Sequence, residues 1–303
     1  MAIPAGALAG TAVLAFGEDN TAAAVYVAVT EQESNRVIVF DKDKPFTDEN
    51  IYKTFGPGAG TWHNLSGIAF RATAHFGTVG LAAASGGKVG MWNITDKQHA
   101  TLDDLLWSAT PGGNPHAIER VPDVGAVVTA SSDGFLTVYG PTEISDPSTL
   151  AEVQQVDLPG AHGVQWDPDG KVLWAVGDKV LRAYEVTGDY RETRLEDTGK
   201  AATFGGLGHD LQPDFTDPGK LLITDTSGVY EVSKSSLEVV EISEEPHVKT
   251  YVRLPSGGDF WIQAEDVEPR PWASPTVHFT DSDDRTRDGA DFYKGRWFST
   301  QWI

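Results

Sequence analysis

Cysteine is absent from the 303-residue sequence, which excludes disulfides and thiolate chemistry. A basic surplus is absent too, because 23 Lys and Arg residues stand against 44 Asp and Glu residues, a formal charge of -21. Such a charge repels phosphate backbones and anionic lipids, so we expect no nucleic-acid partner and no membrane partner. No stretch approaches the ~20 apolar residues of a membrane span. Met1 to Gly6 lacks the basic start of a secretory signal, which fits a mature secreted chain as well as a cytosolic protein.

A sustained helical period is missing as well. No window of helical length repeats its apolar residues about every 3.6 positions. Alternating β-branched runs are frequent instead, and Ala23 to Val29 and Arg36 to Phe40 flank a polar turn in the manner of a hairpin. Hydrophobic residues make up 40% of the chain, enough for a closed β core without disulfides. We expect an all-β protein with one domain over residues 1–303.

One phrase recurs along the chain: a turn-forming residue, a histidine and a short apolar strand. It contains His116, His162, His209 and His247, which lie 46, 47 and 38 residues apart. Repeats of this period are typical of a β-propeller. The first strand of each propeller blade lines a central channel, so the four histidines are expected to converge at one mouth of that channel.

Counting strands predicts a single β-propeller of six blades. The first unit shows only three strands, so we expect the strand around Asp291 to Phe298 to join the N-terminal blade and close the ring, which removes exposed edges. Seven blades remain an alternative, because Thr11 to Phe16 is apolar and unplaced. The fourth unit is expected to contain the strands His162 to Trp166, Lys171 to Val176, Val180 to Val186 and Glu192 to Glu196.

Four histidines at equivalent positions favour a ligand, metal or catalytic site, since serine, threonine or valine would serve packing equally well. Neutral imidazole binds metals and titrates near neutrality. The alternative is a structural role, in which each histidine hydrogen-bonds to the neighbouring blade and fills the channel. For a divalent cofactor metal we consider His162, His209 and His247 as ligands. His63 also precedes a strand, although Ser66 aligns better with the other members.

Lys249 and Tyr251 follow His247 at spacings of two and four, so strand alternation predicts that all three face one side. Arg71 and Arg296 also lie on strands expected near the channel.

Cations directed into the channel of so acidic a protein need a partner. The partner is either a carboxylate of the chain, Asp210 or Glu119, or an anionic ligand such as a uronate carboxylate. Trp62 offers a surface on which a sugar ring can stack.

Four phrases carry a resemblance to a known family: Gly113 to Glu119, Gly160 to Asp167, Gly208 to Pro213 and Phe292 to Trp297. They resemble a family of uncharacterised, often secreted β-propeller proteins of bacteria and fungi, over a stretch from about Trp62 to Trp297. More distantly, the chain is similar to propeller enzymes that cleave acidic polysaccharides, namely rhamnose–glucuronate, ulvan and oligogalacturonate lyases. The resemblance implies a secreted protein in which histidines at the channel mouth act as base or acid, or hold a metal.

The resulting hypothesis is a monomeric polysaccharide lyase-like enzyme whose partner is an acidic oligo- or polysaccharide. His116 or His162 removes the C5 proton of a uronate, and His209, His247 or Tyr251 protonates the leaving oxygen. The developing enolate is stabilised by Arg296, Lys249 or a histidine-bound cation. The expected substrate-binding set is Arg296, Lys249, Arg71, Trp62 and His63.

Two other classes of function compete with the lyase. A non-catalytic carbohydrate- or protein-binding propeller would use the histidines structurally. A metal-dependent lactonase or hydrolase would hold calcium with glutamate, asparagine and aspartate, and the predominance of histidine disfavours it.

Overall fold

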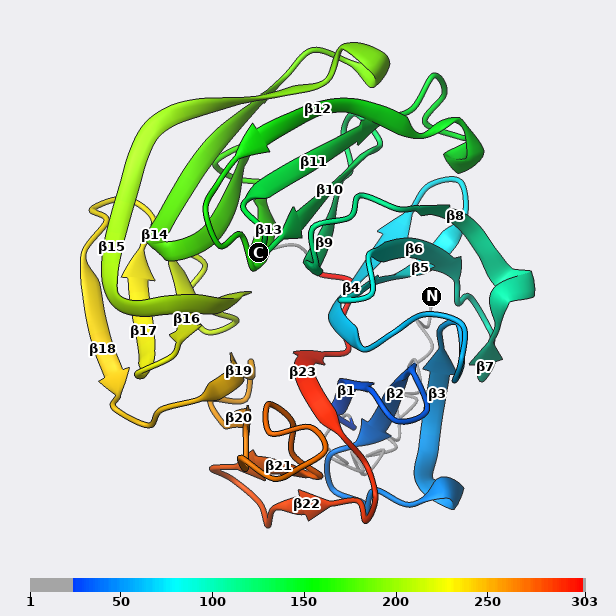
Figure 1. The fold of residues 1–303 in the computed structure, drawn as a ribbon, viewed down its shortest axis with the longest axis vertical. Coiled ribbons are helices and arrows are strands. Elements are labelled where there is room, and N and C mark those ends of the chain that lie inside the picture. Colours follow the sequence, from blue (N-terminus) through cyan, green and yellow to red (C-terminus); the bar gives the residue numbers. More distant parts are fainter. Residues whose placement is uncertain (1–23, 302–303) are drawn as a thin grey trace, which may run out of the picture.

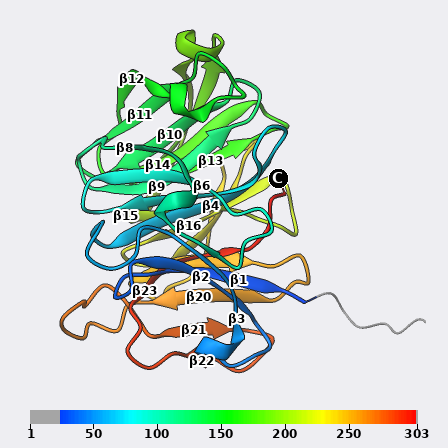
Figure 2. The same ribbon diagram turned by 90° about the vertical axis from the view of Figure 1, so that its right-hand side faces the viewer.

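The structure, a computed structural model, describes residues 24–301. Its strands form five hydrogen-bonded sheets around a common centre (Figure 1), and the view at right angles shows them in stacked layers (Figure 2). No helix in this range is long and apolar enough to cross a membrane. The prediction of an all-β protein is confirmed. The helices are single 3-10 turns: η1 (Asp48–Asn50), η2 (Leu102–Asp104), η3 (Pro147–Thr149) and η4 (Tyr190–Glu192).

The first sheet contains strands from both ends of the described chain. Its order is β23-β1-β2-β3-β7, and β23 pairs with β1 in antiparallel fashion. The last strand of the chain therefore lies beside the first, as Figure 1 shows in red and blue. The strands of this sheet are β1 (Tyr26–Glu31), β2 (Arg36–Asp41), β3 (Ile51–Phe55), β7 (His99–Ala100) and β23 (Phe292–Trp297).

Three further sheets have four strands each. In two of them a tight turn joins the second strand to the third, and Gly87 (φ 101) and Gly134 (φ 120) adopt left-handed backbone in these turns, which glycine does at little cost. The first has the strands β4 (Leu65–Thr73), β5 (Gly77–Ala84), β6 (Lys88–Asn93) and β8 (Leu105–Ala109). The second has β9 (Pro115–Val121), β10 (Ala126–Ser131), β11 (Phe135–Gly140) and β12 (Ala151–Asp157). The third has β19 (Val248–Arg253), β20 (Asp259–Gln263), β21 (Thr276–Phe279) and β22 (Arg285–Thr286).

The remaining sheet has six strands and corrects the predicted number of blades. The hairpin expected between Val176 and Val180 is not formed, because β14 continues as one strand of 16 residues that pairs first with β13 and then with β15. The end of β15 then pairs with β16, so the fourth and fifth units merge. The structure thus has five sheets, not six or seven blades, and Thr11 to Phe16 lies outside the described residues. The six strands are β13 (Gly163–Asp167), β14 (Val172–Thr187), β15 (Arg194–Pro213), β16 (Lys220–Asp225), β17 (Val229–Ser233) and β18 (Val239–Ser243).

Hydrophobic side chains fill the spaces between neighbouring sheets. One cluster joins the first sheet to β19, β20 and β21, and in it the rings of Phe40 and Phe46 stack with centroids 4.2 Å apart. Middle strands such as β10 are buried along their whole length and therefore read as nearly continuous apolar runs. Close approach of sheets requires small residues, since a Cβ on Gly80 would lie 2.7 Å from the ring of Phe55.

Six strands of residues 24–301 line the centre. Five of them bring their N-terminal ends to one mouth, and β15 brings its C-terminal segment, which begins at Gly208. Each contacts the next around the centre, and β23 contacts both β19 and β4. Polar side chains at these ends therefore meet although they lie far apart in the sequence. The inner strands are β4, β9, β13, β15, β19 and β23.

Removal of β23 is expected to unfold the protein rather than merely shorten it. The strand covers the edge of β1 and places Lys294, which is fully buried, at the centre. A chain ending before Phe292 should therefore aggregate or lose its cooperative transition in urea, followed by tryptophan fluorescence. A chain ending at Phe298 retains β23 and is the control. A cooperative transition of normal stability in the shorter chain would contradict this role of β23.

Candidate functional site

A repeated β-bulge sets the direction of the side chains at the channel mouth. In β4, Leu65 pairs with Ala84 and Gly67 pairs with Ala83, which leaves Ser66 as the extra residue. Such a bulge bends the strand and re-aims the extra side chain. The extra residues in three other inner strands are His116 in β9, His209 in β15 and Lys249 in β19. In β23, Tyr293 and Lys294 together oppose the single residue Thr30 of β1. His162 directly precedes β13.

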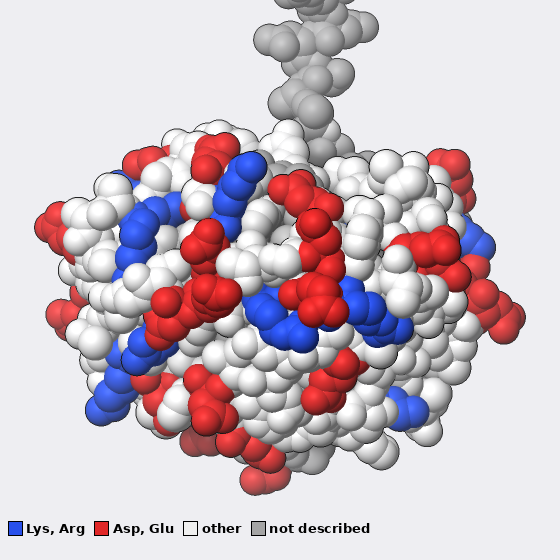
Figure 3. Space-filling view, turned by 90° about the horizontal axis from the view of Figure 1, so that it is seen from above, with Lys and Arg blue, Asp and Glu red and all other residues white. Residues whose placement is uncertain are grey.

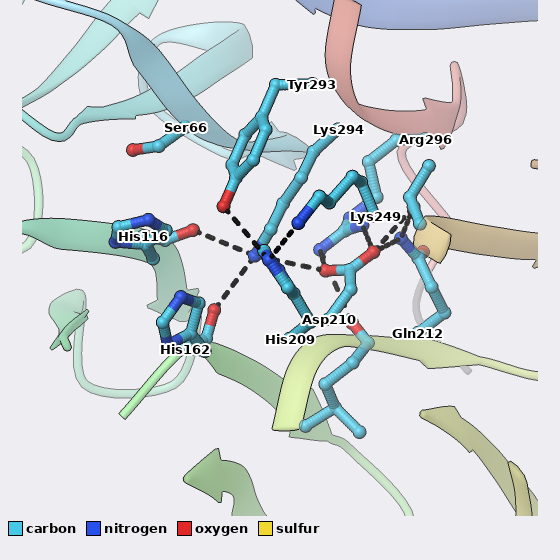
Figure 4. A network of polar contacts seen from close by, with 12 residues as sticks. Ser66, His116, His162, His209, Asp210, Gln212, Lys249, Tyr293, Lys294 and Arg296 are labelled. Carbon is cyan, nitrogen blue, oxygen red and sulfur yellow. Dashed lines mark hydrogen bonds and ion pairs between the residues drawn. The ribbon is translucent and has the colours of Figure 1, made fainter. Parts of the chain in front are cut away.

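Three histidines and one tyrosine form a closed set of rings, here called the mouth ring: His116, His162, His209 and Tyr293 (Figure 4). The centroids of His116 and His162 lie 4.1 Å apart, and those of His162 and His209 4.9 Å apart. The Tyr293 ring lies 5.6 Å from His209 and 5.9 Å from His116. The predicted convergence of these three histidines is therefore seen in the structure.

His247 does not belong to this set. It has a left-handed backbone (φ 62), as do Asn64 (φ 52) and Asn114 (φ 61), which stand two residues before Ser66 and His116. In that register the residue equivalent to the histidines is Lys249. The side chain of His247 is exposed and makes no hydrogen bond or ring contact with other residues of the range 24–301. The alignment expected for His247 therefore fails, because His247 occupies the left-handed position of Asn64 and Asn114, two residues before the extra residue Lys249.

Backbone carbonyls determine the tautomers of two histidines. Nδ1 of His116 lies 2.9 Å from the carbonyl oxygen of Asn114, and Nδ1 of His162 lies 3.1 Å from that of Gly160. A carbonyl only accepts, so both Nδ1 atoms carry the proton and both Nε2 atoms retain a lone pair. Burial, reinforced by Lys294, lowers the pKa of His116 to about 3, and burial together with His116 lowers that of His162 well below its usual range. Both imidazoles are neutral at pH 7.

The ammonium of Lys249 meets the third histidine. Its Nζ donates to Nε2 of His209 over 3.0 Å, while the hydroxyl of Tyr293 lies 3.4 Å from the same nitrogen. Burial lowers the pKa of Lys249 to about 8, and burial followed by Lys249 lowers the pKa of His209. Within residues 24–301, no carboxylate forms an ion pair with Lys249. This cation therefore faces the mouth without an anionic partner from the described chain.

A second lysine lies beneath the mouth ring. Lys294 is fully buried, and its Nζ donates to the carbonyl oxygens of His116 (3.2 Å) and His162 (3.0 Å). Its Nζ also lies 3.5 Å from Oδ1 of Asp210. Burial lowers the pKa of Lys294 to about 8, although Asp210 opposes that change. The lysine thus links three inner strands, β23, β9 and β15, and the residue that precedes β13.

Asp210 is the buried anion of the centre, and its oxygens are saturated by the protein. Arg296 donates to both carboxylate oxygens, over 2.8 and 3.1 Å. The Oδ2 atom also accepts from Gln212 (2.7 Å) and from Thr250 (2.6 Å). A carboxylate whose oxygens are occupied in this bidentate way is not free to act as a base. Arg296, expected to bind substrate, is instead occupied by Asp210.

The other predicted site residues lie elsewhere. Arg71 pairs with Glu119, through Nε at 2.9 Å and a second short contact, and is not part of the mouth ring. Trp62 is only 5% exposed and packs against Trp92, so it offers no stacking surface. His63 is exposed beside Gly86. Tyr251 interacts with Asp259 and Arg253, and burial raises its pKa.

A divalent metal does not fit this arrangement. No three acidic, histidine or cysteine side chains of the described range are placed to hold one. His162 and His209 are neighbours, but the accepting nitrogen of His209 is bonded to Lys249, and His247 is absent from the cluster. Two lysines nearby repel a cation. On the face of the molecule that Figure 3 shows, Asp and Glu side chains lie among Lys and Arg side chains.

An open recess of about 220 Å³ adjoins the mouth ring at His116 and Tyr293. Its wall carries amide and hydroxyl groups and one indole. The remaining lining residues are Gln32, Asn64, Ser85, Asn114 and Trp272.

The sequence alone assigned no role to Tyr293 or Trp272. Tyr293 and Lys294 are adjacent in sequence, so simple alternation would send them to opposite faces. In the bulge of β23 they oppose the single residue Thr30, and both side chains lie at the centre. Trp272 comes from the irregular stretch after β20, where no periodic signal exists.

The sheets around one centre, with polar groups converging from their inner strands, define a β-propeller. The chain belongs to the family of unknown function DUF6528, whose model matches residues 73–301. No curated protein matches the sequence.

Two solved structures show the same fold. One is a protein of unknown function from Bacteroides caccae, with 15% identity and a TM-score of 0.57 over 90% of this chain and 98% of that chain. The other is the WD40 β-propeller domain of Doa1, with 13% identity and a TM-score of 0.54 over 90% of this chain and 82% of that chain. At these sequence identities the similarity shows only that the fold is shared. Neither of the two proteins is described as a lyase.

Acid is expected to destabilise the protein through its buried neutral histidines. Between the ordinary pKa of 6.5 and the folded value of about 3 for His116, the unfolded chain binds a proton that the folded chain does not. The free energy of unfolding therefore falls as pH drops through this window, by up to about 1.4 kcal/mol per pH unit for each such histidine. Urea unfolding between about pH 7 and pH 4 should be less pH-dependent in His116→Gln by on the order of 1 kcal/mol per pH unit. Equal slopes would show that His116 is protonated in the folded protein.

Proposed function

We propose that the channel mouth binds the carboxylate of a uronate unit and cleaves its glycan by β-elimination. The observation that carries this proposal is Lys249, a buried cation with no ion-pair partner among the described residues, beside three neutral imidazoles. Desolvated cations attract anions strongly because the local dielectric is low. Arg71 and Arg296 are spent on Glu119 and Asp210, so Lys249 is the group available for a ligand.

The proposed base is Nε2 of His116 or His162. Each carries a lone pair, because Nδ1 donates to a carbonyl. The low pKa of these imidazoles makes them weak bases in the free protein. A carboxylate bound at Lys249 raises their pKa, since the anion stabilises the imidazolium form and offsets the nearby lysines.

The proposed acid is the hydroxyl of Tyr293 rather than Tyr251. Burial raises its pKa, so it carries its proton at neutral pH. In the reaction, the base takes the C5 proton, and the C5–H electrons form the C4–C5 double bond. The C4–O bond breaks, and the proton of Tyr293 passes to the leaving oxygen. Lys249 stabilises the charge that develops on the carboxylate in the enolate-like transition state.

Non-catalytic carbohydrate binding is a second candidate. The recess next to the mouth ring favours it, because amides, hydroxyls and an indole recognise sugars without any chemistry. Both candidate functions place the glycan at the same channel mouth. Formation of an unsaturated product distinguishes elimination from binding alone.

The direct test follows the absorbance of unsaturated uronate products during incubation with a panel of acidic polysaccharides. Active protein should lose about 100-fold or more of its rate in His116→Ala or His162→Ala, whichever is the base, and in Tyr293→Phe, because proton transfer is removed. Lys249→Met should also lower the rate, through the lost carboxylate contact. His247→Ala is the matched histidine control and should retain activity. A chelator should leave the rate unchanged.

Two results would contradict the lyase. One is absence of product from every uronate glycan while the protein is folded. The other is activity that survives in the His116, His162 and Lys249 variants. Glycan binding without product, weakened by Lys249→Met, would assign the binding function instead.

A further inference from the structure

The recess beside the mouth ring differs chemically from the rest of the surface. Its lining residues are uncharged polar or aromatic, apart from the neutral His116. Other recesses of the described chain contain several charged groups, for example Asp157, Asp178 and Arg182 in one and Glu268 and Arg270 in another. In a protein with a formal charge of -21, an uncharged lining next to Lys249 is a distinct environment.

Unused hydrogen-bonding groups line this recess. The side chains of Asn64 and Ser85 make no hydrogen bond with other residues of the range 24–301. Asn114 uses its Nδ2 to donate to Oγ of Ser132 over 2.8 Å, which leaves its Oδ1 as an acceptor. Amides and hydroxyls of this kind both donate and accept, as sugar hydroxyls do. The left-handed backbone at Asn64 and Asn114, which asparagine tolerates, sets both amides at the mouth.

An indole forms one wall and is held in place. Trp272 is 37% exposed, although its Nε1 donates to Oε1 of Gln32 over 2.9 Å. Gln32 in turn donates through Nε2 to the carbonyl oxygen of Leu65 over 3.0 Å. A large apolar ring kept exposed in one orientation is prepared for a flat apolar partner, and little conformational entropy is lost on binding.

We propose that this recess binds an uncharged sugar ring that adjoins the uronate. The ring stacks on Trp272, its hydroxyls bond to Asn64, Ser85 and Asn114, and the volume of about 220 Å³ suits one ring rather than a chain. The proposal rests on the proposed function in one respect, that the uronate carboxylate lies at Lys249. The substrate class is then a glycan in which a uronate is linked to a neutral sugar.

The test is calorimetric titration of the full chain with three probes: glucuronate, glucose, and a disaccharide of glucuronate and a neutral hexose. Wild-type protein should bind the disaccharide more tightly than glucuronate. Trp272→Ala should weaken disaccharide binding roughly threefold to tenfold, the range of one aromatic contact, and leave glucuronate binding unchanged. Trp272→Phe should retain most of the affinity. Val267→Ala, an exposed residue of the same segment outside the recess, is the control.

The outcomes separate the two proposals. Equal affinity for glucuronate and the disaccharide, or no effect of Trp272→Ala on the disaccharide, would overturn the sugar recess while leaving the uronate site standing. Binding of glucose that depends on Trp272, without any binding of glucuronate, would overturn the uronate site and retain the recess. Thermal unfolding of each variant confirms that it is folded. A matching loss of affinity for both acidic probes in Trp272→Ala would mean that the indole supports the mouth as a whole, which also contradicts a separate recess.

Discussion

A buried ammonium at the centre of the sheets is the contact on which the site depends. Lys294 donates to the backbone of two histidine positions and lies 3.5 Å from the carboxylate of Asp210, so residues distant in sequence are joined at one atom. A charge buried this completely is costly unless every donor finds an acceptor. The bulge in β23 supplies that geometry by turning both Tyr293 and Lys294 towards the centre. Lys294 therefore holds the backbone of His116 and His162 in place beneath the mouth ring.

The same arrangement divides the charges into two groups. Arg296 forms an ion pair with Asp210, and Arg71 forms one with Glu119, so the charges of both arginines are neutralised within the protein. Lys249 has no ion-pair partner among the residues of the described chain. Among the described residues, the ammonium of Lys249 hydrogen-bonds only to the neutral imidazole of His209, so its positive charge is available to an anionic ligand. The mouth is therefore locally cationic within an acidic protein, and this contrast underlies both the proposed uronate site and the uncharged recess next to it.

Much of the fold and part of the site were accessible from the pattern of residues. Alternating strands and the spacing of His116, His162 and His209 correctly indicated repeated sheets whose inner strands meet. The number of sheets was not accessible, because continuation of β14 past Val176 depends on pairing with β15, a long-range choice. His247 was misaligned for a local reason: it occupies the left-handed position two residues before the bulge, where Asn64 and Asn114 stand in other strands.

Sequence alone determined the all-β class, the absence of cysteine chemistry and the acidic charge, because these follow from composition and periodicity. Repeat spacing predicted that four histidines converge, and three of them do. Tertiary structure decided which cations are neutralised, since pairing of Arg296 with Asp210 depends on strands 86 residues apart. It also decided that Lys249 and Tyr293, rather than His247 and Tyr251, complete the mouth. Strand alternation predicts the direction of side chains only where strand pairing is regular. Each bulge at the centre changes which residues face the channel.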